Sequence, residues 1–349
     1  VKIVLGLGGY FLFLAPDTQT VYVSNLNDGR NIVATSFFSA EYHPDDLVSG
    51  ATIDNLVYLF GQETTEIFYI SGGQTVPFDR YGSGAIQYGI QGAFTPQIIQ
   101  GKCYWLGKTK AGVIGVVESQ GGNTQVISTR DLIEKINNYT NIDDVFSWVD
   151  LHNGHTFYNL TFPTAEAYNR GHTWSYDITT GVWFERESYN PTGALFATQD
   201  RHTANASCQL DKRQLIGDFQ SGKIYQLRMD LYDEAGQEIT REIISPHIVV
   251  DDNFLSMYNL EVDVQGGVGI QGSGQGSSPV IMMQCSKDRG HTWSNEYTRS
   301  VGAIGDHRTR VKWGSLGGGY SMTIKLRMSD PVNWAILRAT AQIEVNSGT

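Results

Sequence analysis

Short segments in which apolar and polar residues alternate run through most of the chain, and polar turns join these segments in pairs. Alternation with a period of two is typical of β-strands that bury one face, and two such segments around a short turn predict a β-hairpin. The pattern recurs in GGYFLFLAPDTQTVYVSN, NLVYLFGQETTEIFYISG, GKCYWLGKTKAGVIGVVES, GHTFYNLTFPTAEAY and KRQLIGDFQSGKIYQLRMD. The chain is therefore predicted to be all-β.

These hairpins repeat at intervals of about fifty residues. The equivalent positions are taken to be Phe11, Tyr58, Trp105, Tyr158 and Ile216. Repeats of this length with several strands each are typical of a β-propeller, in which four-stranded sheets pack face to face around an axis. We predict a β-propeller-like domain over residues 1–240. A large β-sandwich with irregular hairpins is the alternative.

The pattern changes after Gly236. The apolar segments become longer, as in MYNLEVDV, and a Gly- and Ser-rich stretch, QGGVGIQGSGQGSSP, precedes PVIMMQCS. This change predicts a second, β-sandwich-like domain over residues 241–349. One helix is expected in ISTRDLIEKINNY, where Ser128 and Asp131 match the S-x-x-D capping box.

Composition supports a folded β protein. Of the 349 residues, 40% are hydrophobic and 11% aromatic, which is enough for substantial cores, while 39 glycines suit many tight turns. The formal net charge of −11 argues against tight nucleic-acid binding, because phosphate contacts need clustered Lys and Arg.

Cysteine usage and the first residues bear on where the chain works. Cys103, Cys208 and Cys285 form no C-x-x-C pair, so neither a disulfide framework nor a zinc site is predicted, and assembly in a reducing cytoplasm fits. The apolar opening IVLGLGGYFLFL contains three Gly and lacks the features of a signal peptide, so we expect a strand there and no membrane anchor. Because the first residue is Val, we expect the N-terminus to be incomplete.

The segment SKDRGHTW at 286–293 matches S-x-D-x-G-x-T-W, the Asp-box of sialidases and related propellers, through Ser286, Asp288, Gly290, Thr292 and Trp293. Related fragments are NRGHTW at 169–174 and NGHTF at 153–157. In this motif the Asp side chain folds back on the backbone while the Gly adopts a positive φ. We interpret these residues as a structural turn and not as a catalytic site.

Other motifs give no site for chemistry. GVGIQG at 267–272 has the spacing of a dinucleotide-binding fingerprint, but more Gly and Ser follow it where a helix should begin. His152, His155 and His172 lack a third metal ligand at a fixed spacing. The pairs Asp143–Asp144 and Glu185–Glu187 could be glycosidase carboxylates, although acidic pairs in turns are more often solvated. No catalytic, cofactor-binding or metal-binding residue is predicted.

An ordered series of segments carries a family resemblance. The series is FGQETTEIFYISGGQTVPFDR at 60–80, YWLGKTKAG at 104–112, VISTRDLIEKINNY at 126–139, GHTFYNLTFPT at 154–164, TWSYDITTGVWFERES at 173–188, IGDFQSGKIYQL at 216–227, and SKDRGHTWS at 286–294 followed by HRTRVKWGSLGGGYSMTIKLRMSDPV at 307–332. In these segments the chain resembles the packaged DNA stabilization protein, the tail hub or tail accessory factor, of short-tailed bacteriophages. The matching positions are turn glycines, strand aromatics and polar turn residues. At 317–320 the chain has Gly-Gly-Gly-Tyr, where a basic residue is expected.

The resemblance implies a structural virion protein and no enzyme. It implies a homo-oligomeric ring, six copies in number, below the portal and its head-to-tail adaptor. The ring would close the channel after packaging, retain the genome, provide the DNA ejection conduit and bear the tail needle, spike or fibres. Genomic DNA would pass without sequence-specific binding, and the protein would assemble in the bacterial host cytoplasm.

A function of a different class is the alternative, namely a carbohydrate-binding or sialidase-like propeller acting on the host surface. A sialidase-type site needs a tyrosine and several arginines that converge from different blades, and the sequence shows no such set. With 36 acidic and 25 basic residues, the channel surface of a ring is expected to be acidic. Arg308, Arg310 and Lys312 are then expected at subunit or partner interfaces.

Overall fold

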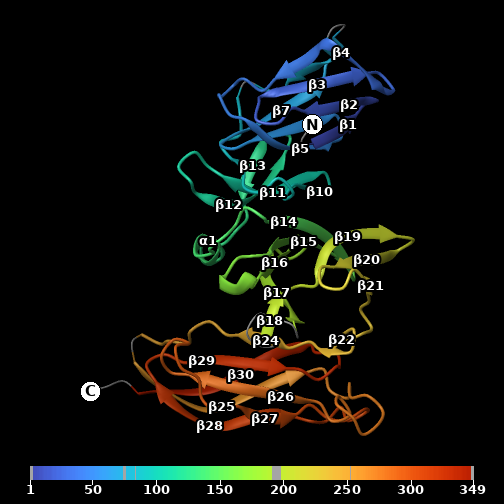
Figure 1. The fold of residues 1–349 in the computed structure, drawn as a ribbon. Helices are drawn as coiled ribbons and strands as arrows, with labels where there is room; N and C mark the ends of the chain where they lie inside the picture. The colour runs from blue at the N-terminus through green and yellow to red at the C-terminus, as the bar shows by residue number, and fades with distance from the viewer. Residues whose placement is uncertain (1–2, 74–75, 83, 191–197, 252, 347–349) are drawn as a thin grey trace. The chain divides into compact units, whose positions relative to one another are not determined.

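The computed structural model describes residues 3–73, 76–82, 84–190, 198–251 and 253–346 (Figure 1). Val1, on which the expectation about the N-terminus is based, lies outside this range. The chain divides into two compact units, Val1–Leu227 and Arg228–Thr349. The sequence pattern predicts the boundary near residue 240, after the small hairpin formed by β22 (Asp233–Glu234) and β23 (Gln237–Glu238).

Five antiparallel sheets follow one another along the described part of the first unit. Sheet 1 contains β1 (Ile3–Leu7), β2 (Tyr10–Leu14), β3 (Thr20–Asn25) and β4 (Asp28–Ser39). Sheet 2 contains β5 (Leu47–Ile53), β6 (Leu56–Gly61), β7 (Thr65–Ile70) and β8 (Phe78–Arg80). Sheet 3 contains β9 (Gly89–Ile90), β10 (Gln97–Ile99), β11 (Lys102–Lys108), β12 (Ile114–Gln120) and β13 (Asn123–Val126).

The two remaining sheets of this unit follow a helix, α1 (Arg130–Asn137). Sheet 4 contains β14 (Phe146–His152), β15 (His155–Phe162), β16 (His172–Asp177), β17 (Val182–Asn190) and β18 (Thr198–Arg201), with the short 3-10 helix η1 (Ala167–Asn169) between β15 and β16. Sheet 5 contains β19 (Ala204–Leu210), β20 (Arg213–Asp218) and β21 (Ile224–Leu227). Apart from β9, which pairs with β11, strands that follow one another within a sheet pair with each other, and the connections β5–β6, β14–β15 and β19–β20 are tight turns, as the hairpin pattern predicts.

Consecutive sheets pack face to face through shared apolar clusters. The first strands of the sheets lie beside one another in succession, β1 with β5, β5 with β10, β10 with β14 and β14 with β19. Each inner sheet buries both faces: in β11, Cys103 and Trp105 pack toward sheet 2, while Tyr104 and Leu106 pack toward sheet 4. Side chains of a strand alternate between faces, so a strand between two sheets presents apolar residues on both sides, as β11 does.

The five positions taken as equivalent in the sequence all lie on the strand next to the first edge strand of their sheets, namely β2, β6, β11, β15 and β20, where the edge strand of sheet 3 is β10. The predicted repeat is therefore the repeat of the fold. Four of these residues are buried, whereas Phe11 is 43% exposed. This difference arises because no sheet covers the outer face of sheet 1 among the described residues.

The helix forms where it was predicted, but its N-cap differs. Thr129 is the N-cap, and its hydroxyl accepts a hydrogen bond from the backbone N–H of Leu132 at 3.3 Å. The Ser128 hydroxyl instead accepts from the backbone N–H of Val116 on β12, at 3.0 Å. The predicted capping box is thus wrong by one residue, because a backbone donor of the neighbouring strand engages Ser128.

The second unit contains two antiparallel sheets besides the β22–β23 hairpin (Figure 1). One sheet has the order β24 (Arg241–Ile244), β29 (Thr323–Met328), β26 (Val280–Ser286) and β27 (Tyr297–Ser300). The other has the order β28 (Val311–Gly319), β25 (Phe254–Val264) and β30 (Ile336–Asn346). Residues 267–272, with the spacing of a dinucleotide-binding fingerprint, lie in an irregular loop and begin no helix.

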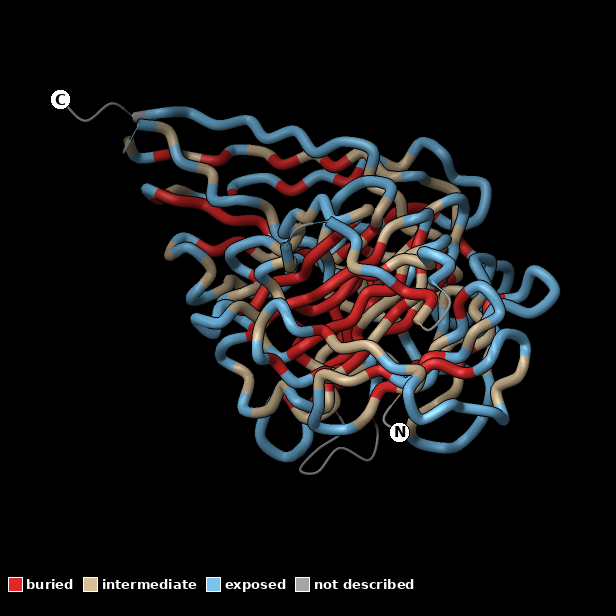
Figure 2. The backbone as a smooth tube through the Cα atoms, turned by 90° about the horizontal axis from the view of Figure 1, so that it is seen from above, coloured by how far each residue is buried: buried red, intermediate tan, exposed pale blue. Residues whose placement is uncertain are grey.

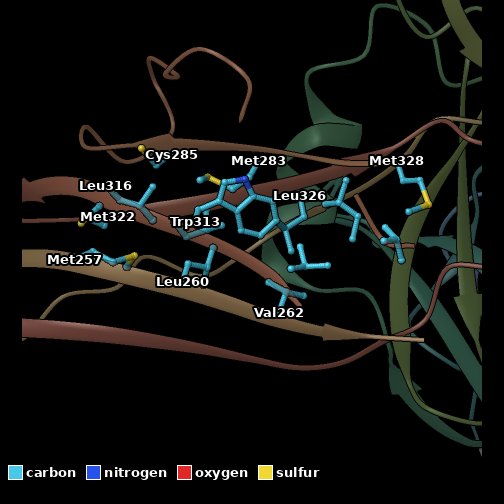
Figure 3. Packing of buried hydrophobic residues seen from close by; sticks show 14 of the residues in the cluster. Met257, Leu260, Val262, Met283, Cys285, Trp313, Leu316, Met322, Leu326 and Met328 are labelled. Atoms are coloured by element: carbon cyan, nitrogen blue, oxygen red, sulfur yellow. The ribbon is translucent and has the colours of Figure 1, made fainter. Parts of the chain in front are cut away.

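A sulfur-rich core lies between these two sheets. Figure 3 shows Trp313 of β28 at its centre, with Met257 and Leu260 of β25 and Met283 and Leu326 of the facing sheet around it. The Trp313 indole N–H donates to the backbone carbonyl of Tyr297 at 2.8 Å, so the buried ring leaves no polar group unpaired. The unit is a two-layer β-sandwich with its own core.

Glycine is required at 318. A Cβ atom there would lie 2.4 Å from the carbonyl oxygen of Leu255 on the paired strand β25. At Gly317, a Cβ atom would lie 2.8 Å from the ammonium of Lys287. The ammonium of Lys287, a residue distant in sequence, therefore lies beside Gly317.

Candidate functional site

The Asp-box residues form one hydrogen-bonded turn directly after β26. The Ser286 hydroxyl donates to Asp288 Oδ1 at 2.7 Å and accepts from the backbone N–H of Gly290 at 2.8 Å. Thr292 donates to the same carboxylate through its backbone N–H, at 2.8 Å to Oδ1, and through its hydroxyl, at 2.5 Å to Oδ2. Gly290 has φ of 90°, a conformation that a residue with a Cβ atom rarely adopts.

These bonds occupy the acid of the motif. Hydrogen bonds from the hydroxyl and backbone N–H of Thr292, and then from Ser286, hold the pKa of Asp288 well below its usual value. A carboxylate that accepts hydrogen bonds from three donors of its own turn stabilises the backbone conformation of that turn. This geometry supports the proposal that the motif is structural.

The turn belongs to the sandwich and not to a sheet of the first unit. The Trp293 ring lies under the ammonium of Lys325 on β29, at 4.2 Å from the ring centroid, which ties the turn to the sheet. The related fragment at 153–157 forms the β14–β15 hairpin turn, with positive φ at Asn153 and Gly154. The fragment at 169–174 instead enters β16 from η1, so only one of the two fragments forms a tight hairpin.

A second kind of aspartate turn occurs twice in the first unit, and it was not predicted from the sequence. In DITTG at 177–181, Asp177 accepts from the Thr179 backbone N–H at 2.9 Å and from the Thr180 hydroxyl at 2.6 Å. In DFQSG at 218–222, Asp218 accepts from the Gln220 backbone N–H at 2.8 Å and from the Ser221 hydroxyl. Both segments end in a glycine with positive φ, so the shared pattern D-x-x-[ST]-G is the signal that could have revealed them.

Both turns bind ionised aspartate. Burial acts to raise the pKa of each carboxyl, but the hydrogen bonds from the turn hold it below the usual value. Turns of this kind therefore bind two of the 36 acidic residues of the chain.

The acids considered as glycosidase pairs are bound by neighbouring side chains. Glu185 lies 2.5 Å from His172 Nδ1, and Glu166 lies 2.9 Å from Nε2 of the same ring. Glu187 lies 3.7 Å from Arg170. Burial acts to lower the pKa of His172, but the two glutamates raise it above the usual value. This cluster is a histidine held between two carboxylates, at the first residue of β16.

Sheet 4 also contains a buried polar network that the sequence does not reveal. Asp150 is fully buried and accepts from Asn159 Nδ2 at 2.6 Å and from Arg186 Nη1 at 3.1 Å, with His152 Nε2 at 2.6 Å. Beside it, burial and then the Arg186 charge lower the pKa of His202 to about 3, so this imidazole is neutral. The network pairs every charge that it buries, as buried charges require.

The three predicted interface cations lie together on the sandwich surface, in or next to β28. Arg308, Arg310 and Lys312 are exposed, and Lys312 pairs with Glu261 of β25 in the strand register. Arg310 contacts Glu261 Oε1 through both Nε, at 2.8 Å, and Nη2, at 2.5 Å. Arg310 thus has an acidic partner within its own chain, and its role at an interface stays a proposal, as do those of Arg308 and Lys312.

A cavity of about 690 Å³ lies at the first strands of sheets 4 and 5. Its lining includes Phe94, Gln97, Trp148, Asn205 and Gln209. Asp144 is the one carboxylate among the lining residues, and its Oδ2 accepts from the Thr164 hydroxyl at 2.7 Å. Hydrolysis of a glycosidic bond ordinarily uses two carboxylates on opposite sides of the bond. Among the described lining residues, this cavity has one carboxylate, that of Asp144.

Within the described ranges, no three His, Cys, Asp or Glu side chains come together as metal ligands. The three cysteines are free thiols, of which Cys208 is exposed. In the same part of the chain, the helix is too short and polar to cross a membrane.

Two protein-family models match the chain, one in each of its two units. The model described as "Bacteriophage P22 Gp10, beta-propeller" matches residues 2–232, and the model described as "Bacteriophage P22 Gp10, beta-sandwich" matches residues 240–344. The chain belongs to the bacteriophage P22 Gp10 family. The predicted architecture, a propeller-like region followed by a sandwich-like domain, is confirmed, as is the predicted resemblance to a tail hub protein of short-tailed phages.

Membership of the Gp10 family makes this chain a structural protein of the phage tail. Its place is the tail of the virion, in assembly with other phage proteins. No curated protein is similar enough to this chain to count as a relative.

Solved structures resemble the chain only distantly. An exo-β-1,3-galactanase from Phanerochaete chrysosporium is 10% identical with a TM-score of 0.34, covering 98% of this chain and 95% of that chain. The Trypanosoma rangeli sialidase is 10% identical with a TM-score of 0.30, covering 98% and 80%. A GH43 endo-arabinanase from Bacillus licheniformis is 15% identical with a TM-score of 0.28, covering 66% and 93%. Likenesses this weak carry no functional argument.

Proposed function

We propose that the chain is the subunit of a tail hub ring of six copies that closes the portal channel after packaging. The ring retains the genome, provides the DNA ejection conduit and bears the tail needle, spike or fibres. Its neighbours on the head side are the portal and the head-to-tail adaptor. The observation that carries this proposal is the match of both units, in order, to the two regions of one tail hub family.

The charge distribution supports a conduit that does not bind DNA tightly. Acidic residues exceed basic ones by 36 to 25, and many basic side chains are engaged within the chain. Arg186 binds buried Asp150, Arg201 packs at 3.9 Å over the Phe219 ring, and Arg310 and Arg338 each contact an acid of β25. Phosphate binding needs clustered cations free to release counterions. A ring with such a surface can centre a duplex by repulsion over about a Debye length, roughly 8 Å at physiological ionic strength.

The packing of the first unit supports a role in which the protein withstands mechanical force. Successive sheets share apolar clusters, and Trp105 lies in one of them with its indole N–H donating to the Gly89 carbonyl at 3.0 Å. Side chains packed at interior density resist deformation. A closed tail channel must withstand the pressure of packaged DNA, so rigid sheets suit this function.

A carbohydrate-binding or sialidase-like function is the second candidate, and one observation favours it. Asp144 lines the cavity, and its Oδ1 is buried without a hydrogen-bond partner in the described residues. A single acid without a second carboxylate is a weak basis for hydrolysis. An assay of purified chain against host surface glycans, with Asp144→Asn as control, tests this candidate directly.

Genome retention is the test of the proposed function. Particles assembled without the chain are expected to fill with DNA and then lose it, so that the DNA becomes sensitive to nuclease. Complementation with the wild-type chain is expected to restore protected genomes. Stable, fully packaged particles in the absence of the chain would contradict the hub function. Loss of host adsorption alone, with genomes retained, would favour the carbohydrate candidate.

A further inference from the structure

Strand β30 is the edge of the three-stranded sheet of the sandwich, and its apolar residues Leu337, Ile343 and Val345 are exposed, from 37% at Ile343 to 73% at Leu337. From Leu337 to Val345 every residue is exposed, and Figure 2 shows this strand in pale blue as it leads to the C-terminus. Apolar side chains alternate with polar ones over this stretch, the apolar set being Leu337, Ala339, Ala341, Ile343 and Val345. An alternating strand normally buries its apolar face.

The register shows where that face points. Met257, Leu260 and Val262 of the paired strand β25 are buried in the sandwich core, and they lie opposite Ile343, Ala341 and Ala339. Directly paired residues of antiparallel strands point to the same side. The apolar face of β30 therefore continues the inner face of the sheet beyond the core.

The four-stranded sheet that faces β30 across the sandwich also has an exposed apolar residue on its inner side. Its edge strand β24 pairs with β29, where Ile243 lies opposite the buried Leu326. Ile243 thus points to the inner side as well, and it is 51% exposed. The sandwich has apolar residues on its inner faces that no described residue covers.

The edge of β30 also lacks the usual protection against strand pairing. The strand is 11 residues long, contains no proline, and carries only two charges, Arg338 and Glu344. Natural edge strands are normally shortened, charged or interrupted by proline, because their free backbone groups accept another strand. An edge of this length is suited to strand addition.

We propose that β30 pairs with β30 of a second copy of this chain, antiparallel, about a two-fold axis at Ala341. In this register Arg338 lies opposite Glu344 of the second copy. By symmetry, Glu344 lies opposite Arg338 of the second copy, so two ion pairs form. Ala339 lies opposite Ile343, and Thr340 lies opposite Gln342. From Leu337 to Val345 every position thus meets one of matching polarity, and both ion pairs are favourable.

Other registers are less complementary. A two-fold axis perpendicular to the sheet keeps the apolar faces of both copies on the same side of the sheet. This requires that the residue at the axis lie directly opposite the same residue of the second copy. An axis through Thr340 places Arg338 opposite Gln342, and an axis through Gln342 places Glu344 opposite Thr340. Of these three registers, the one centred on Ala341 joins the two opposite charges.

The contacts that these charges already make are compatible with the pairing. Arg338 Nε and Nη2 lie 3.0 and 2.7 Å from Asp263 Oδ2 on β25, which holds the side chain extended across the polar face. Glu344 accepts from the Tyr258 hydroxyl on the same face. A guanidinium is planar and has a further edge for a second carboxylate. Asp263, Arg338 and Glu344 of the second copy would then form a row of charged groups across the boundary between the two β30 strands.

Charge reversal tests the proposal. The isolated wild-type chain is expected to be in equilibrium between monomer and dimer when its mass is followed by light scattering from about 1 to 100 µM. Arg338→Glu places like charges opposite each other twice and should raise the dissociation constant about tenfold or more. The double variant Arg338→Glu with Glu344→Arg restores both pairs and should recover the dimer. A wild-type chain that stays monomeric over this range, or a double variant no better than the single one, would overturn the proposal.

A cross-link tests the register itself. In a Cys208→Ser background, Ala341→Cys should form a disulfide between two copies, because directly opposite Cα atoms in antiparallel strands are about 4.5 to 5.5 Å apart. Ala339→Cys, two residues away on the same face, should not, because it lies opposite Ile343. Equal cross-linking of both variants would mean another register and would contradict the axis at Ala341. A two-fold dimer of free chains is distinct from a cyclic ring, so failure here leaves the hub function untouched.

Discussion

Gly290 shows how a single residue supports a turn of the sandwich. Its φ of 90° lets the backbone N–H reach the Ser286 hydroxyl, and a Cβ atom there would meet no atom closer than 3.7 Å. Gly290→Ala is therefore strained by its backbone conformation and not by lack of space. It should lower the free energy of unfolding by about 1 to 2 kcal/mol.

Calorimetric melting checks this value. Gly274→Ala is the matched control, because Gly274 lies in the same unit, has no positive φ and has open space around its Cα. The control is expected to melt like the wild type. Equal melting of the Gly290→Ala protein and the control would mean that the Asp-box turn does not need glycine.

His172 predicts a pH dependence of stability. Its pKa is raised in the folded chain by Glu185 and Glu166, against the effect of burial. A raised folded pKa gives a stabilising contribution that is complete below the unfolded value of about 6.5 and is lost as the pH rises through the folded pKa. The wild type should lose stability over this range relative to His172→Gln, whose curve should be flatter.

Unfolding in denaturant at a series of pH values from about 6 to 9 measures this difference. Parallel curves for the two proteins would show that the two glutamates do not hold the histidine in its charged form.

Local patterns were readable at the residue scale because their partners are close in sequence. The Asp-box could be recognised since Ser286, Asp288 and Thr292 bond one another. The cation under which Trp293 lies, Lys325, is set by strand pairing and cannot be inferred from spacing. The same holds for the acid beside Arg310, which comes from a strand distant in sequence.

At the scale of elements, hairpins and their repeat were predictable, whereas strand edges and caps were not. Strands β6, β11 and β15 could be recognised at successive repeats because each is a short, mostly apolar segment that is buried along most of its length. The helix cap moved to Thr129 because Ser128 is bound by β12, a contact between elements. That β30 would be exposed could not be inferred, since its alternation is that of a buried strand.

The clusters between sheets predict a gradient of local stability in the first unit. Sheets 3 and 4 share a large cluster that includes α1, whereas Trp148, Ala204 and Ile216 are the only buried residues of the described cluster between sheets 4 and 5. Local opening costs less free energy where less apolar surface is buried. Strands β19 to β21 should therefore exchange their amide hydrogens faster than β11 and β12.

Hydrogen exchange followed by mass spectrometry on peptides from both regions measures this gradient. Equal protection of β20 and β11 would contradict it, and would mean that sheet 5 is stabilised by contacts that its small cluster does not include.

For the whole molecule, the excess of acidic residues predicts how the chain treats DNA. At physiological salt the isolated chain should give no mobility shift of a duplex at about 1 µM, because its acidic residues exceed its basic ones by 36 to 25, and Arg310 and Arg338 bind acids of the same chain. Tight binding that weakens steeply with salt would indicate a clamp on DNA in place of a passive conduit.

The position of the chain in the assembled particle tests the central claim most directly. Images of particles, compared with those of particles lacking the chain, should show a closed ring of six copies around the channel below the portal. A chain located on the capsid surface or at the tips of the fibres, with the channel unchanged by its loss, would contradict the account.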